Sequence, residues 1–131
     1  MRKTFLLFAL LFICSFAHAE KFYIASIVSS SNDSQPAKYG AWLDLTDRGI
    51  KIYERNREEP DVTMIISCGK RVQLQGYEDA VVYKYIGFLL DDSYPDEARN
   101  FSVMVGTLPR GAKFVELMCP YYNMWIRYVL K

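Results

Sequence analysis

Three pairs of neighbouring carboxylates come nearest to a catalytic set in this chain. Two carboxyl groups at a fixed separation suffice to hydrolyse a glycosidic bond, one as the acid and the other as nucleophile or base. The pairs all lie in hydrophilic, turn-rich segments, where adjacent acids ordinarily remain solvated. A small histidine-free hydrolase of cell-wall sugars is therefore the alternative hypothesis and not the leading one. The pairs are Asp91/Asp92, Glu58/Glu59 and Asp96/Glu97.

Most other catalytic chemistry is excluded by residues that the chain lacks. The one histidine, His18, lies in an N-terminal segment that we expect to be removed. Without it the chain cannot build a Ser-His-Asp or Cys-His site. It also lacks the usual zinc ligand sets and the glycine-rich phosphate loops. The acidic segment 91–97 lacks the ligand spacing and glycine of a calcium loop. We therefore expect a protein that is not an enzyme and that holds no metal and no cofactor.

The same acidic segment is the candidate partner-binding site. Its acids suit insertion into a basic cleft, by electrostatic complementarity, and Tyr94 with Pro95 gives a stiff aromatic tip. The chain also has ten tyrosines, a residue favoured both at recognition surfaces and in strands. The candidate partner-binding residues are Asp91, Asp92, Tyr94, Asp96 and Glu97.

The first 19 residues predict a secretory signal peptide. Arg2 and Lys3 precede an apolar run from Phe5 to Phe16, and Ala17-His18-Ala19 supplies small residues at the cleavage site. The run is shorter than the roughly 20 residues that a membrane span needs, so we expect cleavage after Ala19 and no stable membrane insertion. The short signal favours a bacterial periplasmic, secreted or cell-surface protein.

Cleavage would leave residues 20–131 as a single β-rich domain. Removing 19 of 131 residues leaves 112, with 14 basic against 15 acidic side chains, a balance that predicts no nucleic-acid binding. Two cysteines remain, Cys68 and Cys119. In an oxidising compartment such a pair most often forms a disulfide, and closing this loop stabilises a domain by about 4 kcal/mol.

Hydrophobic periodicity of two predicts strands along most of this domain. The strongest hairpin signal surrounds Thr46–Gly49, where we expect a type I turn with Gly49 at positive φ. The almost unbroken apolar run Val62–Cys68 predicts a central strand buried on both faces. The predicted strands are Phe22–Val28, Tyr39–Leu45, Ile50–Glu54, Val62–Cys68, Arg71–Gln75, Val81–Leu90, Phe101–Val105 and Lys113–Cys119.

For two segments the sequence alone does not decide between helix and strand. A short helix is expected near 94–100, and the tail 121–131 fits either a strand or a helix that begins at Pro120. The tyrosine, tryptophan and β-branched content of the tail favours a strand. The predicted fold is thus mainly β, an antiparallel sheet folded as a small sandwich or partial barrel with one disulfide.

A set of local features resembles the small secreted proteins related to surface-adhesin protein E. These are the aromatic opening Phe22-Tyr23, the Trp42–Leu45 segment before a hairpin, Ser67-Cys68 before Gly69, and the Leu108–Ala112 turn before a strand ending in Cys119. The chain departs from that pattern in the twelve residues after Cys119 and in the segment 91–97. The resemblance implies an antiparallel sheet tied by Cys68–Cys119 and an exposed binding role.

These observations favour a non-catalytic protein of the bacterial envelope that binds a protein partner outside the cytoplasm. One form of this hypothesis is an adhesin-like protein for host matrix. The other is a periplasmic immunity or inhibitor protein that blocks a toxin or muramidase.

Overall fold

The structure is a computed structural model that describes residues 20–31, 35–37, 40–55, 58–74 and 77–131, without the side chains of Cys68 and Tyr77. The expected signal peptide therefore lies outside the described residues. The described part forms nine strands and one 3-10 helix. They are β1 (Glu20–Ser29), β2 (Gln35–Pro36), β3 (Trp42–Leu45), β4 (Gly49–Tyr53), β5 (Val62–Leu74), β6 (Tyr77–Leu89), η1 (Asp96–Arg99), β7 (Asn100–Thr107), β8 (Lys113–Cys119) and β9 (Met124–Leu130).

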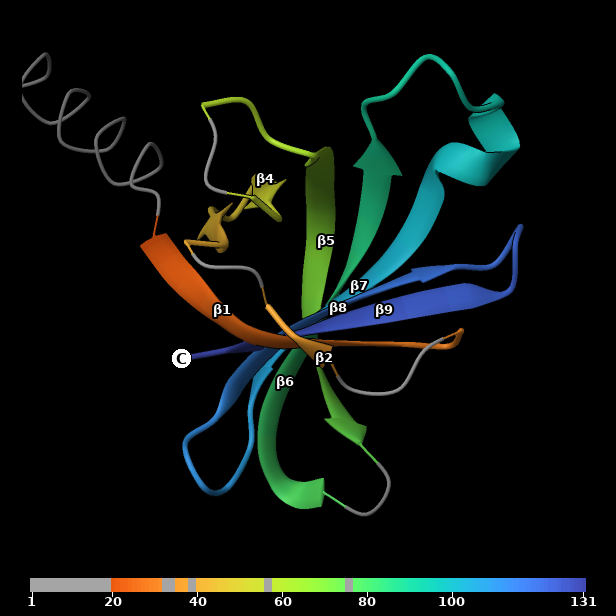
Figure 1. Ribbon diagram of the computed structural model, residues 1–131. Helices are drawn as coiled ribbons and strands as arrows, with labels where there is room; N and C mark the ends of the chain where they lie inside the picture. Colours follow the sequence, from red (N-terminus) through yellow and green to blue (C-terminus); the bar gives the residue numbers. More distant parts are fainter. Residues whose placement is uncertain (1–19, 32–34, 38–39, 56–57, 75–76) are drawn as a thin grey trace, which may run out of the picture.

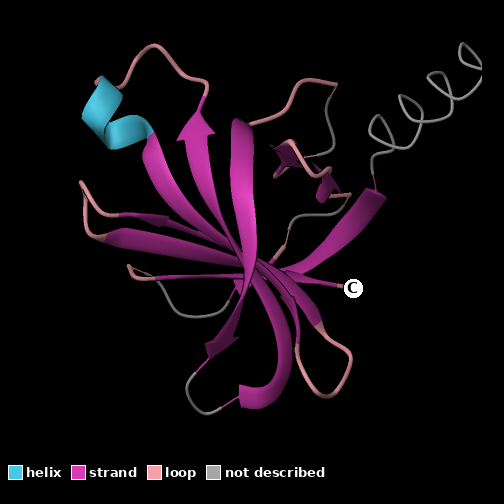
Figure 2. Cartoon of the chain, turned by 180° about the vertical axis from the view of Figure 1, so that it is seen from behind, coloured by secondary structure: helices cyan, strands magenta, loops and turns pink. Residues whose placement is uncertain are grey.

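The sheet is an antiparallel meander that closes on itself as a barrel. From β3 to β9 each strand pairs with the next in sequence order, and β1 pairs with both β3 and β9. The barrel therefore consists of β1 and β3–β9, while β2 adds a short pairing beside β1. In the views of Figures 1 and 2, which look at the molecule from opposite sides, the strands overlap at the centre and spread apart toward the ends of the barrel.

One irregularity in β1 makes closure possible. Residues 20–23 pair with β3, and residues from Ile24 onward pair with β9, with a register shift between Ile24 and Ser26. A bulge bends a strand and increases its twist, so β1 can leave one neighbour and join the other. Closure leaves the barrel strands without the free edges that an open sheet exposes.

The interior is filled by apolar side chains that alternate along the strands. This is the period-two pattern that the sequence carries, and it places every second residue inside. Each large aliphatic side chain removed from water contributes roughly 1.5–3 kcal/mol. The buried core residues are Ile24, Ala41, Leu43, Ile50, Ile52, Met64, Ile66, Val103, Val115, Leu117, Tyr128 and Leu130.

A smaller apolar cluster lies on the outer face of β6 and β8. Val82 is fully buried and Phe114 is 3% exposed, and both pack near Gly106 of the strand between them. Half-buried Val72 and Leu74, from the far end of β5, pack against this cluster. The long β5–β6 hairpin thus contributes to a second core outside the barrel.

The mainly β, antiparallel prediction is confirmed, and the sandwich is wrong because the sheet closes completely. The tail forms strand β9 and no helix, and the expected short helix is η1. The hairpin around Thr46–Gly49 is confirmed, but Gly49 is not at positive φ. There the Thr46 hydroxyl accepts hydrogen bonds from the amides of Arg48 and Gly49, at 3.2 and 2.9 Å.

The prediction of a strand buried on both faces at Val62–Cys68 is wrong. Met64 and Ile66 point into the core, whereas Ile65 between them is 50% exposed. A barrel has one interior, so a strand in its wall can bury only alternate residues. The strand also continues past Gly69 to Leu74, where the sequence predicts a break.

The predicted Cys68–Cys119 disulfide is not part of this structure. Cys119 is a buried free thiol that donates a hydrogen bond to the carbonyl of Ala98 at 3.5 Å, and the side chain of Cys68 lies outside the described residues. Strands β6 and β7 separate β5 from β8 in the sheet. Three strand spacings amount to about 14 Å along the sheet, whereas a disulfide needs α-carbons within about 7 Å.

Turns and connections gather at the two ends of the barrel. The β6–β7 connection with η1 and the β8–β9 turn lie at one end, and the β7–β8 turn lies at the opposite end, together with the end of β5 and the start of β6 (Figure 1). The predicted turn at Pro109–Gly111 belongs to the opposite end. Gly111 adopts a φ of 89° there, a conformation that favours glycine.

Candidate functional site: the cup at one end of the barrel

A hollow of about 620 Å³ opens at the end of the barrel that carries η1. Its floor consists of buried or half-buried apolar side chains that continue the core, including Leu89, Phe101, Leu117, Cys119 and Ile126. We call this hollow the cup. Small-molecule sites typically occupy roughly 300–1,000 Å³ and are mostly apolar, with a few polar groups at the edge. The cup falls within that class.

Three aromatic side chains line the cup nearer its opening: Tyr94, Tyr122 and Trp125. The rings of Tyr94 and Tyr122 approach edge to face, with centroids 6.4 Å apart, although they come from different connections. Trp125 is held where β9 begins, because its amide donates to the Ser30 hydroxyl at 3.2 Å and its carbonyl accepts from the Ser30 amide at 3.0 Å. Ser30, directly after β1, therefore positions Trp125 at the cup.

The β8–β9 turn presents a further tyrosine beside the cup. The Asn123 amide donates to the Pro120 carbonyl at 3.2 Å, and Asn123 adopts a φ of 51°, which asparagine tolerates better than most residues. This tight turn directs Tyr121 and Tyr122 outward, 57% and 46% exposed, and their rings meet edge to face at 4.9 Å. We call Tyr94, Tyr121 and Tyr122 the rim tyrosines.

The polar part of the cup carries negative charge. Asp61 and Asp91 belong to the lining together with Ser29, Ser30 and Ser31. One oxygen of Asp61 accepts a hydrogen bond from the Glu54 amide at 2.8 Å. Among the described residues that line the cup there is no lysine, arginine or histidine. The site therefore has two carboxylates above an apolar floor.

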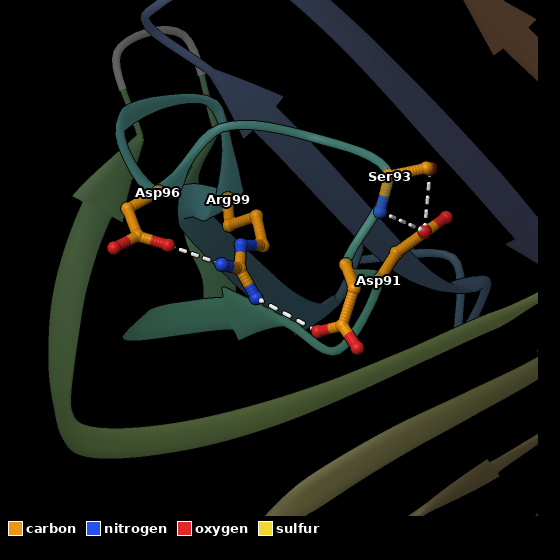
Figure 3. Close-up of polar contacts among 5 residues, drawn as sticks. Asp91, Ser93, Asp96 and Arg99 are labelled. Carbon is orange, nitrogen blue, oxygen red and sulfur yellow. Dashed lines mark hydrogen bonds and ion pairs between the residues drawn. The ribbon is translucent and has the colours of Figure 1, made fainter.

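The acidic loop (residues 91–97) folds against its own arginine. The Arg99 guanidinium lies 3.5 Å from an Asp92 carboxylate oxygen and also pairs with Asp96. Figure 3 shows Arg99 reaching toward Asp96 on one side and toward the start of the loop on the other. The side chain of Arg99 is only 17% exposed, so the pairing ties the loop to η1. Asp92 and Asp96 remain exposed, so the ion pairs with Arg99 leave their carboxylates accessible at the surface.

Asp91 is held by a different contact. Its Oδ1 accepts hydrogen bonds from the Ser93 hydroxyl at 2.6 Å and the Ser93 amide at 3.0 Å (Figure 3). These two hydrogen bonds, with a smaller contribution from the Arg99 charge, lower the pKa of Asp91 from its usual range. Asp91 is therefore ionised at neutral pH and is poorly suited to act as a general acid.

The structure brings together part of the sequence-predicted site. Asp91 and Tyr94 line the cup, and Asp92, Asp96 and Glu97 are exposed beside it. The other carboxylate pair, Glu58/Glu59, is exposed in the β4–β5 connection and does not line the cup. Sequence reasoning missed Asp61, Trp125 and the serines at the end of β1, because only barrel closure brings these distant segments together.

A second aromatic group lies on the outer surface, away from the cup. Trp42 of β3 stacks on Tyr53 of β4 with ring centroids 3.9 Å apart, and the Lys21 ammonium lies 4.2 Å from the Trp42 ring. These contacts join β1, β3 and β4. They account for this cluster as cross-strand packing.

In the described part of the chain, no three potential ligand side chains gather as a metal site. Over the same residues, no helix has the length and apolar character needed to cross a membrane. Comparison with protein-family models, curated proteins and solved structures found no match to this chain.

Proposed function

We propose that this chain is a non-catalytic, exported protein of the bacterial envelope that binds a protein partner at the cup end of its barrel. The observation that carries the proposal is the joint exposure of the three rim tyrosines, one within the acidic loop and two in the β8–β9 turn. Tyr94, Tyr121 and Tyr122 are 43%, 57% and 46% exposed, so three large aromatic rings lie in contact with water. Export and the periplasmic or cell-surface location rest on the expected signal peptide.

The aromatic part of this surface has the chemistry of a binding hot spot. Tyrosine is enriched at interfaces because it offers a large, rigid contact area with a polar tip. The two edge-to-face contacts among the rim tyrosines limit their rotamers before any partner arrives. Less side-chain entropy is then lost on binding.

The charged part defines the class of partner. Four carboxylates and the Arg99 guanidinium give residues 91–99 a net charge of −3. A basic surface or cleft is complementary to it, as on a toxin, a muramidase or a host matrix protein. An adhesin-like protein and a periplasmic immunity or inhibitor protein are the two forms of this proposal.

Capture from envelope extract with matched variants tests the proposal. The first variant changes Asp91, Asp92 and Asp96 to Asn and Glu97 to Gln, and the control changes Glu78 to Gln and Asp79 to Asn, both exposed near the start of β6. We expect one protein to be retained by wild type and by the control, and to be lost with the acidic-loop variant. Equal retention by all three forms would contradict binding through this loop.

The hydrolase alternative gains no support from the geometry of these acids. A glycosidase needs one carboxylic acid whose pKa is raised so that it can donate a proton. Here the pKa of Asp91 is lowered, and Asp92 and Asp96 both pair with Arg99. Hydrolysis of peptidoglycan by the purified protein, lost in Asp91→Asn, would reverse this preference.

A further inference from the structure

We infer that the cup is also a binding site for a small amphiphile that has an apolar tail and a positively charged head, such as an alkyl ammonium. This inference goes beyond the protein partner and does not depend on it. It rests on the shape of the barrel interior and on the charges of the lining.

The apolar floor of the cup favours an apolar tail in the ligand. An eight-stranded barrel is just wide enough either to be filled by side chains or to hold one small ligand. Here the side chains fill the middle of the barrel and leave about 620 Å³ at one end, above Leu117, Phe101 and Leu89. An apolar ligand group in that space would displace water from the apolar side chains of the floor, which is favourable.

The charged and aromatic side chains that line the cup determine which head group the ligand should have. Asp61 and Asp91 are the charged residues among the described lining, and both repel an anion. Tyr94, Tyr122 and Trp125 line the same space, and the face of an aromatic ring attracts a cation. Arg99 lies outside the lining and is engaged by Asp92 and Asp96. The cup therefore favours a cationic head over a carboxylate or sulfate.

The test uses the fluorescence of Trp125. The chain has two tryptophans, and Trp42 lies outside the cup on β3, so Trp42→Phe leaves Trp125 as the reporter. Decyltrimethylammonium and decyl sulfate share one tail and differ in head charge, and both are titrated well below their micelle concentrations. We expect saturable binding of the cation with at least about tenfold preference over the anion. Shortening the tail to octyl should weaken binding by about fourfold per methylene removed.

Two matched pairs of variants locate the site. Tyr122→Ala should weaken binding several-fold, whereas Tyr121→Ala, its exposed neighbour outside the lining, should not. Asp91→Asn should reduce the cation preference, whereas Asp92→Asn should leave it. All four positions are exposed, and unchanged circular dichroism verifies folding. Equal affinity for the two heads, no saturation, or equal effects within either pair would overturn the inference. Failure to capture a protein partner would leave it standing.

Discussion

Tyr128 shows how a single polar group is accommodated in the apolar interior. Its ring is 1% exposed, and its hydroxyl donates a hydrogen bond of 2.8 Å to Glu54 Oε1 at the end of β4. Burial, and then the Glu54 charge, raise the pKa of Tyr128 far above its usual value. Because a buried polar group without a partner is costly, this hydrogen bond also holds the Glu54 side chain against β9.

We expect Tyr128→Phe to lower the free energy of unfolding by about 1–2 kcal/mol, because a hydrogen bond to a charged group is lost while the ring remains. Urea unfolding of the two proteins measures the difference. Tyr121→Phe is the control, since that side chain is 57% exposed. Equal losses in both variants would show that the hydroxyl of Tyr128 contributes nothing specific.

The same residue makes stability depend on alkaline pH. Above about pH 10 an unfolded tyrosine ionises, whereas the folded Tyr128 keeps its proton because its pKa is raised. The unfolded state then binds fewer protons, so the free energy of unfolding falls by up to about 1.4 kcal/mol per pH unit. Burial also raises the pKa of Tyr85, which adds a slope of the same sign. Tyr128→Phe should flatten the decline between about pH 10 and 11, and an unchanged slope would contradict this assignment.

Among the strands, β6 illustrates how tightly the elements pack. A β-carbon added at Gly87 would lie 2.6 Å from Met64 Sδ and 2.8 Å from Val103 Cγ2, and both neighbours are buried in the core. We expect Gly87→Ala to cost roughly 1–3 kcal/mol of stability through overpacking. Ser67→Ala, at an exposed position of β5, serves as the control in thermal unfolding. An alanine variant as stable as wild type would mean that this part of the interior is looser than the structure indicates.

The strands could be predicted where the signal is local. Alternating side chains indicated β1, β8 and the tail strand β9, and turn residues indicated the β3–β4 hairpin. For strand β5 the prediction of burial on both faces is wrong, because Ile65 belongs to an apolar run but faces outward in a barrel wall. An apolar run alone does not tell a strand buried on both faces from one buried on a single face.

At the scale of the molecule, the closing contact between β1 and β9 could not be predicted. It joins Ile24 to Leu130, at the two ends of the domain, and no local pattern encodes such a pairing. The same holds for the candidate site. The acidic segment alone predicts Asp91 and Tyr94 as site residues, whereas Trp125 and Asp61 line the cup only because the sheet closes.

Closure also determines the state of the cysteines. Because β6 and β7 separate Cys68 from Cys119, we expect Cys119 to be a thiol in the folded protein. Iodoacetamide should label it slowly in the native state, where it is 4% exposed, and rapidly after unfolding without reductant. Peptide mass spectrometry reads the label. A Cys119 peptide that stays unlabelled until a reductant is added would restore the disulfide and contradict the strand order.

Binding of a protein partner at the cup end is the central claim, and hydrogen–deuterium exchange with and without the captured partner tests it most directly. We predict slower exchange in residues 91–99 and 120–124, which carry the acidic loop and the rim tyrosines. Residues 77–80 and 108–112, which belong to the opposite end, should exchange at the same rate in both samples. Protection confined to the opposite end, or to the outer face around Ile65 and Ile86, would contradict the account.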